Sequence, residues 1–475
     1  MQVNLEPFGG SMYRKYFICF AFTFSVALLV TADRTEAASQ QYRPSDTNLT
    51  LRQADSRGEN ITPSAVGPPE PRGGVTLQDV LSLALAHNPD LASFSIEVRA
   101  ADARALQAGL RPNPELSVET ENIFGREELR RFDSAETTLQ ISQLIELAGK
   151  RPKRMRVASL ERDLAGWDYE ASKSDVLTET AKSFVDVLEA QERLALTEEL
   201  LRLAEQVFDI VSQRVKAGKV SPMEETKAGV VLSNSRIERE RARIALEAAR
   251  KRLAVAWGSG TPTYEKVIGR LEPAELVPPT EEMTRGILRN PDIARWDTEL
   301  AQRRAEIALQ EANRIPDLSL GGGVRHFNET DDRAFVLGAS IPLPLFNRNQ
   351  GEILASRHQL AKAKKERGAA EGKVRAAIAE IYGSLSTATT EIEILKTTII
   401  PGAQSVFEAA SEGYRLGKFG FLDVLDAQRT LFEAKGQYIS ALATYHKAFA
   451  DLERAVGRFS DMDERIPEKS EDKRK

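Results

Sequence analysis

The pattern of hydrophobic and polar residues divides most of the chain into long helical stretches and short alternating ones. In four stretches, apolar residues recur at the three- and four-residue spacing of one face of an α-helix. This spacing predicts long helices over residues 150–217, 221–257, 350–416 and 421–457. At 1.5 Å per residue, the helix over 150–217 would be on the order of 100 Å long.

Two shorter regions alternate between apolar and polar residues, which is the pattern of a strand with one apolar and one wet face. Each region holds two such runs separated by a charged loop, so each predicts a β-hairpin. The hairpins are expected at about residues 114–146 and 316–345. In the first, Leu116, Val118 and Thr120 alternate with Glu115, Ser117, Glu119 and Glu121.

The second half of the chain repeats the first. Residues 208–258 align without gaps on residues 407–457 at a constant offset of 199 (407 − 208), and a Gly-Lys pair recurs in both turns. Asn88-Pro-Asp-Leu91 is likewise repeated at Asn290-Pro-Asp-Ile293. Such a period indicates an internal duplication. The predicted fold is mainly α with a small β part, as two helix–β-hairpin–helix repeats over 75–258 and 280–457, joined by a link at 259–279.

Four strands per chain are too few to close a transmembrane barrel, because lipid leaves edge hydrogen bonds unsatisfied and the smallest barrels hold about eight strands. If these strands span a membrane, an oligomer is therefore required. Two chains would supply about eight strands and three about twelve. The alternative is a soluble, elongated coiled-coil scaffold with small hairpins at one end.

The two ends of the chain and its composition limit the possible classes of function further. Residues 1–38 resemble a secretory signal peptide, with either Met1 or Met12 as the start. Residues 39–74 are predicted to form a flexible linker, and residues 458–475 a charged tail. A net charge of −5 over 475 residues argues against nucleic acid as a partner. The single cysteine, Cys19, lies inside the predicted signal, and the four histidines have no ligand spacing. No cofactor, bound metal or enzymatic activity is expected.

The duplicated layout, the paired Asn-Pro-Asp motifs and the Gly-Lys turns together resemble the TolC-like outer-membrane factor family, from about residue 75 to residue 457. Ile145-Glu-Leu-Ala-Gly-Lys-Arg151 and Pro342-Leu-Pro-Leu-Phe-Asn-Arg-Asn-Gln-Gly351 resemble its heavy-metal cation efflux branch. The resemblance implies a homotrimer in the outer membrane of a Gram-negative bacterium, with a twelve-stranded β-barrel in the lipid and a long α-helical barrel extending into the periplasm.

The same resemblance implies a passive exit duct of a tripartite efflux pump. A periplasmic adaptor would join the duct to an inner-membrane pump of the RND type, and the cargo would be heavy-metal cations. A drug or secretion duct of the same family is the alternative.

Two acidic residues, Asp423 and Asp426, fall where this family places carboxylates at the periplasmic mouth, and Glu224 is the counterpart of Asp423 in the first repeat (224 + 199 = 423). Three copies of each would form rings that favour cations. Asp423 and Asp426 have a second interpretation as acids that complement the dipole of a helix N-terminus. Glu224 also fits a capping box, because Ser221 and Pro222 precede it at the start of a helix. Tyr414 matches a tyrosine that helps to hold the mouth shut in the family, whereas Phe419 replaces a latching arginine.

Two further groups of residues are candidates for contacts. The turns between the long helices would face the adaptor through Gly218, Lys219, Val220, Gly417, Lys418 and Phe419, although the glycines are also needed simply to form the turns. Glu115, Glu119 and Glu121 are expected to face the barrel lumen, because carboxylates on a lipid face are costly, or to lie low at the junction of barrel and tunnel.

Overall fold

The computed structural model describes residues 71–272 and 286–457. The predicted signal peptide, the tail at 458–475 and nearly all of the predicted linker lie outside the described residues. The first repeat contains β1 (Gly73–Val75), α1 (Leu77–His87), α2 (Pro89–Ala108), β2 (Glu115–Glu121), a 3₁₀ turn (Glu127–Leu129), β3 (Glu136–Ile145), α3 (Lys150–Lys216) and α4 (Pro222–Val255). After β4 (Tyr264–Val267) come a 3₁₀ turn (Ile287–Arg289), α6 (Pro291–Asn313), β5 (Leu318–Phe327), β6 (Asp332–Ser340), α7 (Gln350–Ile394), a π-helical turn (Leu395–Ile399), α8 (Ile400–Arg415) and α9 (Phe421–Ala455).

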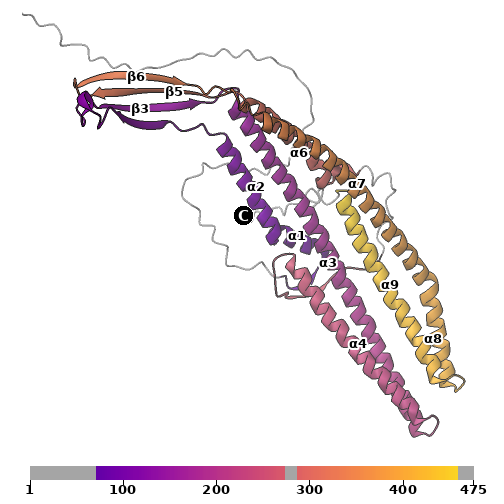
Figure 1. The fold of residues 1–475 in the computed structure, drawn as a ribbon. Helices are drawn as coiled ribbons and strands as arrows, with labels where there is room; N and C mark the ends of the chain where they lie inside the picture. The colour runs from indigo at the N-terminus through magenta and orange to yellow at the C-terminus, as the bar shows by residue number, and fades with distance from the viewer. Residues whose placement is uncertain (1–70, 273–285, 458–475) are drawn as a thin grey trace, which may run out of the picture. The chain divides into compact units, whose positions relative to one another are not determined.

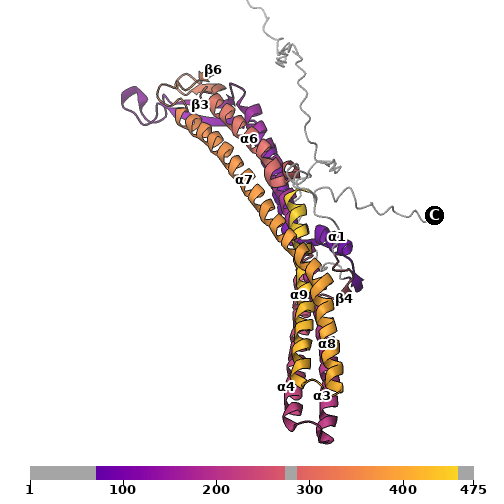
Figure 2. The ribbon, with the colours of Figure 1, turned by 90° about the vertical axis from the view of Figure 1, so that its right-hand side faces the viewer.

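The helices pack side by side in two connected rows (Figures 1 and 2). Toward the turns between the long helices, the packing order is α4, α3, α9 and then α8 with α7. Toward the sheet, α3 and α7 continue and the order becomes α2, α3, α6, α7. In both rows, helices of the first repeat form one edge and helices of the second repeat form the other. Within the described ranges, no helix is both long enough and apolar enough to cross a membrane.

The two predicted hairpins form one sheet rather than two separate units. The strand order is β2-β3-β5-β6, and every neighbouring pair is antiparallel. All ten residues of β3 pair with β5, from Glu136 opposite Phe327 to Ile145 opposite Leu318. Alternation along the sequence places strands but does not pair them, so this central pairing was not predicted. It leaves β2 and β6 as the two edges of the sheet.

The repeated Asn-Pro-Asp motif joins the end of one helix to the start of another. Asn88 accepts a hydrogen bond from the N–H of Leu91 at the start of α2, and its amide donates to the carbonyl oxygen of Ala256, just beyond α4 (2.9 Å). Asn290 likewise begins α6, and its amide donates to Ala455 at the end of α9 (3.1 Å). Both asparagines are buried. Each side chain therefore satisfies an N–H of one helix and a carbonyl of another.

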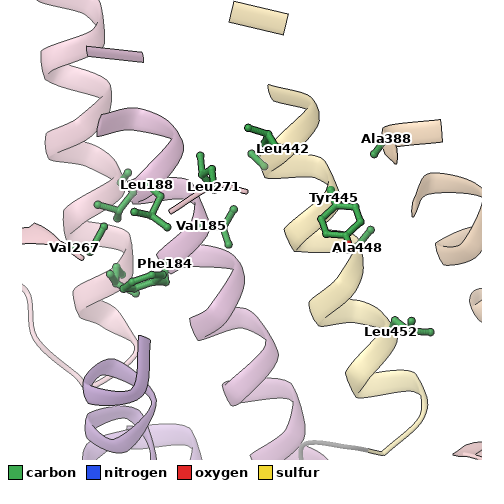
Figure 3. Packing of buried hydrophobic residues seen from close by; sticks show 14 of the residues in the cluster. Phe184, Val185, Leu188, Val267, Leu271, Ala388, Leu442, Tyr445, Ala448 and Leu452 are labelled. Carbon is green, nitrogen blue, oxygen red and sulfur yellow. The ribbon is translucent and has the colours of Figure 1, made fainter. Parts of the chain in front are cut away.

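The predicted linker and the predicted inter-repeat link both contain residues that pack against the rest of the described chain. Gly73 and Gly74, assigned to the linker, belong to β1, which pairs in parallel with β4. Within the link, Tyr264, Val267 and Leu271 are buried. Figure 3 shows Val267 and Leu271 beside Phe184, Val185 and Leu188 of α3. Short apolar runs flanked by proline and glycine read as linkers, and only burial against α3 makes them part of the core.

The predicted helix over 350–416 is interrupted by the π-helical turn at Leu395–Ile399, whereas α3 runs unbroken through the first repeat. Pro401 lies two residues after this turn and has no N–H to donate to the carbonyl of Thr397, four residues before it. A widened turn is one way in which a helix accommodates such a disturbance. The two repeats therefore differ at this point.

Candidate functional site

The two turns between the long helices have the same backbone geometry. Gly218 and Gly417 are left-handed, with φ of +71° and +73°. In each turn the lysine N–H donates to a carbonyl five residues back, from Lys219 to Arg214 (2.9 Å) and from Lys418 to Gly413 (2.8 Å). This bonding is that of a Schellman motif, which requires a residue that tolerates positive φ. The duplication seen in the sequence is thus reproduced in the turn geometry.

Tyr414 links three helices next to these turns. Its side chain is buried at the end of α8, and its hydroxyl donates to the Oε2 of Glu224 on α4 (3.2 Å). Arg214 of α3 donates to the carbonyl oxygen of Tyr414 (2.8 Å), and its guanidinium lies 4.5 Å from the centre of the phenol ring. Burial and then the Glu224 carboxylate raise the pKa of Tyr414 above its usual 10, while Arg214 opposes the shift. Sequence analysis identified Tyr414 and Glu224 separately but missed Arg214.

In the structure the first-turn carboxylate that caps its own helix is Asp423 and not Glu224. Ser221 caps α4 by accepting from the N–H of Met223, while the Glu224 carboxylate accepts from Tyr414. Ser221 and Pro222 thus begin α4 as predicted, but Glu224 does not complete a capping box. Asp423 instead performs this kind of capping in α9, because its Oδ2 accepts from the N–H of Gly420 (2.8 Å).

The acidic residues on the first turns of α9 remain in contact with solvent. Asp423 and Asp426 are both exposed. Arg429, one turn further along, pairs with Glu433 (2.7 Å). This hydrogen bond, with a smaller contribution from Asp426, raises the pKa of Arg429. Asp426 is thus an exposed carboxylate near the turn, whereas Asp423 combines exposure with a capping role.

The two turns differ in the apolar residues that they expose. Lys219 and Lys418 are both exposed. Phe419 is 51% exposed, and its ring lies so close to Gly413 that a Cβ added there would overlap the ring. Val220, which was expected to be an exposed contact, is half-buried. Phe419 therefore offers more apolar surface at its turn than Val220 does.

The sheet has one polar and one apolar face, as the alternation predicted. Glu115, Glu119 and Glu121 lie opposite Ser142, Thr138 and Glu136 in the register, so these six residues share a face. The other face carries the apolar residues Leu116, Val118, Leu139, Ile141, Leu318, Leu320, Val324, Phe335 and Leu337.

Arg325 of β5 crosses the polar face and was not singled out from the sequence. Its guanidinium pairs with Glu136 (2.7 Å) and with Glu121 (3.2 Å), and its Nε donates to the hydroxyl of Thr138 (2.9 Å). The sequence did hold a signal for Arg325, because it lies two residues after Gly323 on a strand whose residues alternate between two faces. Glu121 is therefore partly neutralised by a cation on the same face.

Comparisons with known proteins first define the fold. The structure resembles a crystal structure of a membrane protein from Pseudomonas aeruginosa, with a TM-score of 0.68 and 20% identity over 80% of this chain and 90% of that one. It resembles CusC equally, with a TM-score of 0.67 and 20% identity over 80% and 92% of the two chains. VceC from Vibrio cholerae gives a TM-score of 0.67 at 17% identity, over 80% and 96%. These likenesses show the TolC-like channel fold.

The sequence then gives the family. The family model described as "Outer membrane efflux protein" matches residues 80–259 and 285–458. A curated relative, the cobalt-zinc-cadmium resistance protein CzcC of Cupriavidus metallidurans, is 34% identical over 86% of this chain and 96% of its own length. The nickel-cobalt-cadmium resistance protein NccC of Alcaligenes xylosoxydans xylosoxydans is 26% identical over 68% and 74%. The chain belongs to the outer membrane efflux protein family.

This family membership confirms the resemblance inferred from the motifs and the turns. The chain is a transport channel of the Gram-negative outer membrane that extends into the periplasm, and not an enzyme. The soluble scaffold alternative is thereby excluded. Within the described residues, no group of histidine, cysteine or acidic side chains is arranged to hold a metal ion.

Proposed function

We propose that three copies of the chain close into a ring, with β2 of one copy pairing with β6 of the next. The support is that the sheet and both rows of helices have the same kind of edges. In each of them, an element of the first repeat forms one edge and an element of the second repeat forms the other. These edges are β2 and β6 in the sheet, α2 and α7 near the sheet, and α4 and α8 near the turns. Joining unlike edges by rotation forms a closed ring, and three copies make twelve strands with no free edge.

In this ring the polar face of the sheet surrounds the lumen. The support is the division of the sheet into two faces, since a barrel in lipid needs apolar residues outside and tolerates polar residues inside. Glu115, Glu119 and Glu121 then line the conduit, with Arg325 offsetting part of their charge. The lumen is net acidic at this level.

The ring acts as the passive exit duct of a tripartite efflux pump for heavy-metal cations. The observation that carries the cargo assignment is the 34% identity to CzcC along 96% of that protein. A periplasmic adaptor would contact the turns through Gly218, Lys219, Gly417, Lys418 and Phe419, with Val220 at the margin. An inner-membrane pump of the RND type would supply the energy.

The second candidate cargo is an organic compound. Its support is a weaker likeness, 24% identity over 80% of this chain, to the pyoverdine export outer membrane protein OpmQ of Pseudomonas putida. Cells that lack their own duct, supplied with this chain and its neighbouring pump, separate the two candidates. The heavy-metal assignment predicts restored tolerance to cobalt, zinc or cadmium. Restored export of an organic compound without metal tolerance would contradict it.

At the mouth, Tyr414 and Glu224 form the latch and Asp426 the acidic ring. Opening the mouth would separate α8 from α4, and the hydrogen bond between Tyr414 and Glu224 opposes that separation. Asp423 adds charge but also caps α9. Single-channel recording in a planar bilayer tests the ring, with Asp426→Asn expected to reduce cation selectivity. Unchanged selectivity would mean that the acidic face of the sheet, and not Asp426, selects for cations.

A further inference from the structure

A groove lies beside the π-helical turn of the second repeat. Its volume is about 560 Å³, and it opens to solvent between α7, the π-turn and α9. The lining includes Thr390, Glu391, Ile394, Leu395, Ile399 and Gln437. Ile394 and Ile399 are 48% and 40% exposed. An apolar floor with a carboxylate at its edge is left without a covering element in a single chain.

The π-turn creates this groove. In a regular α-helix, two residues five positions apart point about 140° away from each other. Across the widened turn, Ile394 and Ile399 line the same groove. Ile394 also lies about half a helical turn from Ile392, which is buried on the packed side of α7. The groove therefore lies largely on the side of α7 that its own chain leaves open.

A matching apolar stripe runs along α4. Val230, Ile237 and Ile244 recur every seven residues and are 56%, 50% and 54% exposed. At about 100° per residue, this stripe lies roughly half a turn from Ala228 and Leu232. Those two residues are buried where α4 packs on α3. The stripe thus points away from α3, the helix with which α4 makes most of its contacts in the described chain.

The stripe and the groove lie at matching heights above the turns. From the helical rise, Ile237 lies roughly 28 Å above Gly218 and Ile399 lies roughly 27 Å above Gly417. By the same rise, Ile244 lies roughly 39 Å above its turn and Ile394 lies roughly 35 Å above its own. The two turns are themselves level, because Tyr414 near one contacts Glu224 near the other. A closed ring has no rise between copies, so these heights are preserved from one copy to the next.

Charge is complementary at the same level. Arg241 lies on the stripe between the two isoleucines, and its side chain is 72% exposed. Glu391 lines the groove one turn before Ile394. The helical rise places Arg241 roughly 35 Å and Glu391 roughly 39 Å above their respective turns. In its own chain Arg241 pairs with Glu238 of the same helix (2.7 Å). A difference in height of about 4 Å is within the reach of its side chain, so Arg241 could also pair with a carboxylate at the edge of the groove.

We propose that the groove at the π-turn is the seat for the α4 stripe of a neighbouring copy, with Ile237 on Ile399, Ile244 on Ile394 and Arg241 on Glu391. This inference rests on the ring proposed above and names the contact that sets its register. The π-turn is then an assembly element. It presents two isoleucines of the second repeat to one partner helix, and the unbroken α3 has no equivalent.

Disulfide cross-linking tests the contact. In a Cys19→Ser background, one chain carries Ile244→Cys and Ile394→Cys, which the proposal brings within disulfide distance between copies. The control chain carries Ile237→Cys and Tyr382→Cys, similarly exposed positions whose heights differ by roughly 24 Å at 1.5 Å per residue. Oxidation of the detergent-extracted protein should give covalent trimers several-fold more efficiently for the first pair.

The mass of the uncross-linked complex separates failure of this inference from failure of the ring. A trimer whose matched pair cross-links no better than the control would overturn the groove assignment and leave the ring standing. A monomer would overturn both. A charge exchange gives a second readout. Arg241→Glu should weaken the trimer against heating, Glu391→Arg in the same chain should restore it, and Arg236→Glu on another side of α4 should have little effect. Absence of rescue would remove Arg241 and Glu391 from the contact.

Discussion

The hydrogen bond between Tyr414 and Glu224 gives the sharpest test of how the mouth is held shut. Tyr414→Phe removes only the hydroxyl and leaves the ring beside Arg214. A hydrogen bond to a charged group contributes about 1.5–3 kcal/mol, and the 3.2 Å distance is long for a hydroxyl donor, so about 1 kcal/mol is expected here. Three copies acting together would shift the balance between shut and open mouths by about 3 kcal/mol, or roughly 150-fold.

The assay is the open probability of single channels in a planar bilayer. Tyr414→Phe should raise the open probability, and Glu224→Gln should raise it as well. The double variant should add little to either single change, because both remove the same interaction. Arg415→Ala is the matched control, since it deletes an exposed ion pair with Glu412 on the same helix. An open probability that is unchanged in Tyr414→Phe, in channels that conduct normally, would refute the latch.

Three further predictions concern stability and pH. Asn290→Ala should lower the free energy of unfolding by about 1–3 kcal/mol, because a buried carbonyl at Ala455 loses its donor; denaturant unfolding followed by circular dichroism measures this. Gly323→Ala should prevent correct sheet assembly, because the added Cβ would overlap a carbonyl oxygen of β3. Gly322→Ala is the control, because its Cβ would lie 3.4 Å from the nearest side-chain atom. The yield of heat-stable oligomer distinguishes the two variants. Burial and Glu224 raise the pKa of Tyr414, so its phenol should stay protonated through neutral pH. The contribution of this phenol to stability should be lost only as the pH rises above about 10. The difference in tyrosinate absorbance between the wild type and Tyr414→Phe measures the ionisation of Tyr414.

The sequence alone determined the local elements and their duplication. Helical periodicity, strand alternation and turn glycines are properties of neighbouring residues, so they are readable without any tertiary contact. The positive φ at Gly218 and Gly417 and the polar face carrying Glu115, Glu119 and Glu121 follow directly from such patterns. The repeated motifs also identified the family.

Only the tertiary structure decided which distant elements meet. The pairing of β3 with β5 and the addition of β1 and β4 to the core join segments far apart in the chain. Glu224 and Asp423 occupy equivalent positions in the two repeats, yet one accepts from Tyr414, 190 residues away, and the other caps its own helix. The two positions look alike locally, and their roles differ because side-chain partners depend on packing through space rather than on sequence spacing.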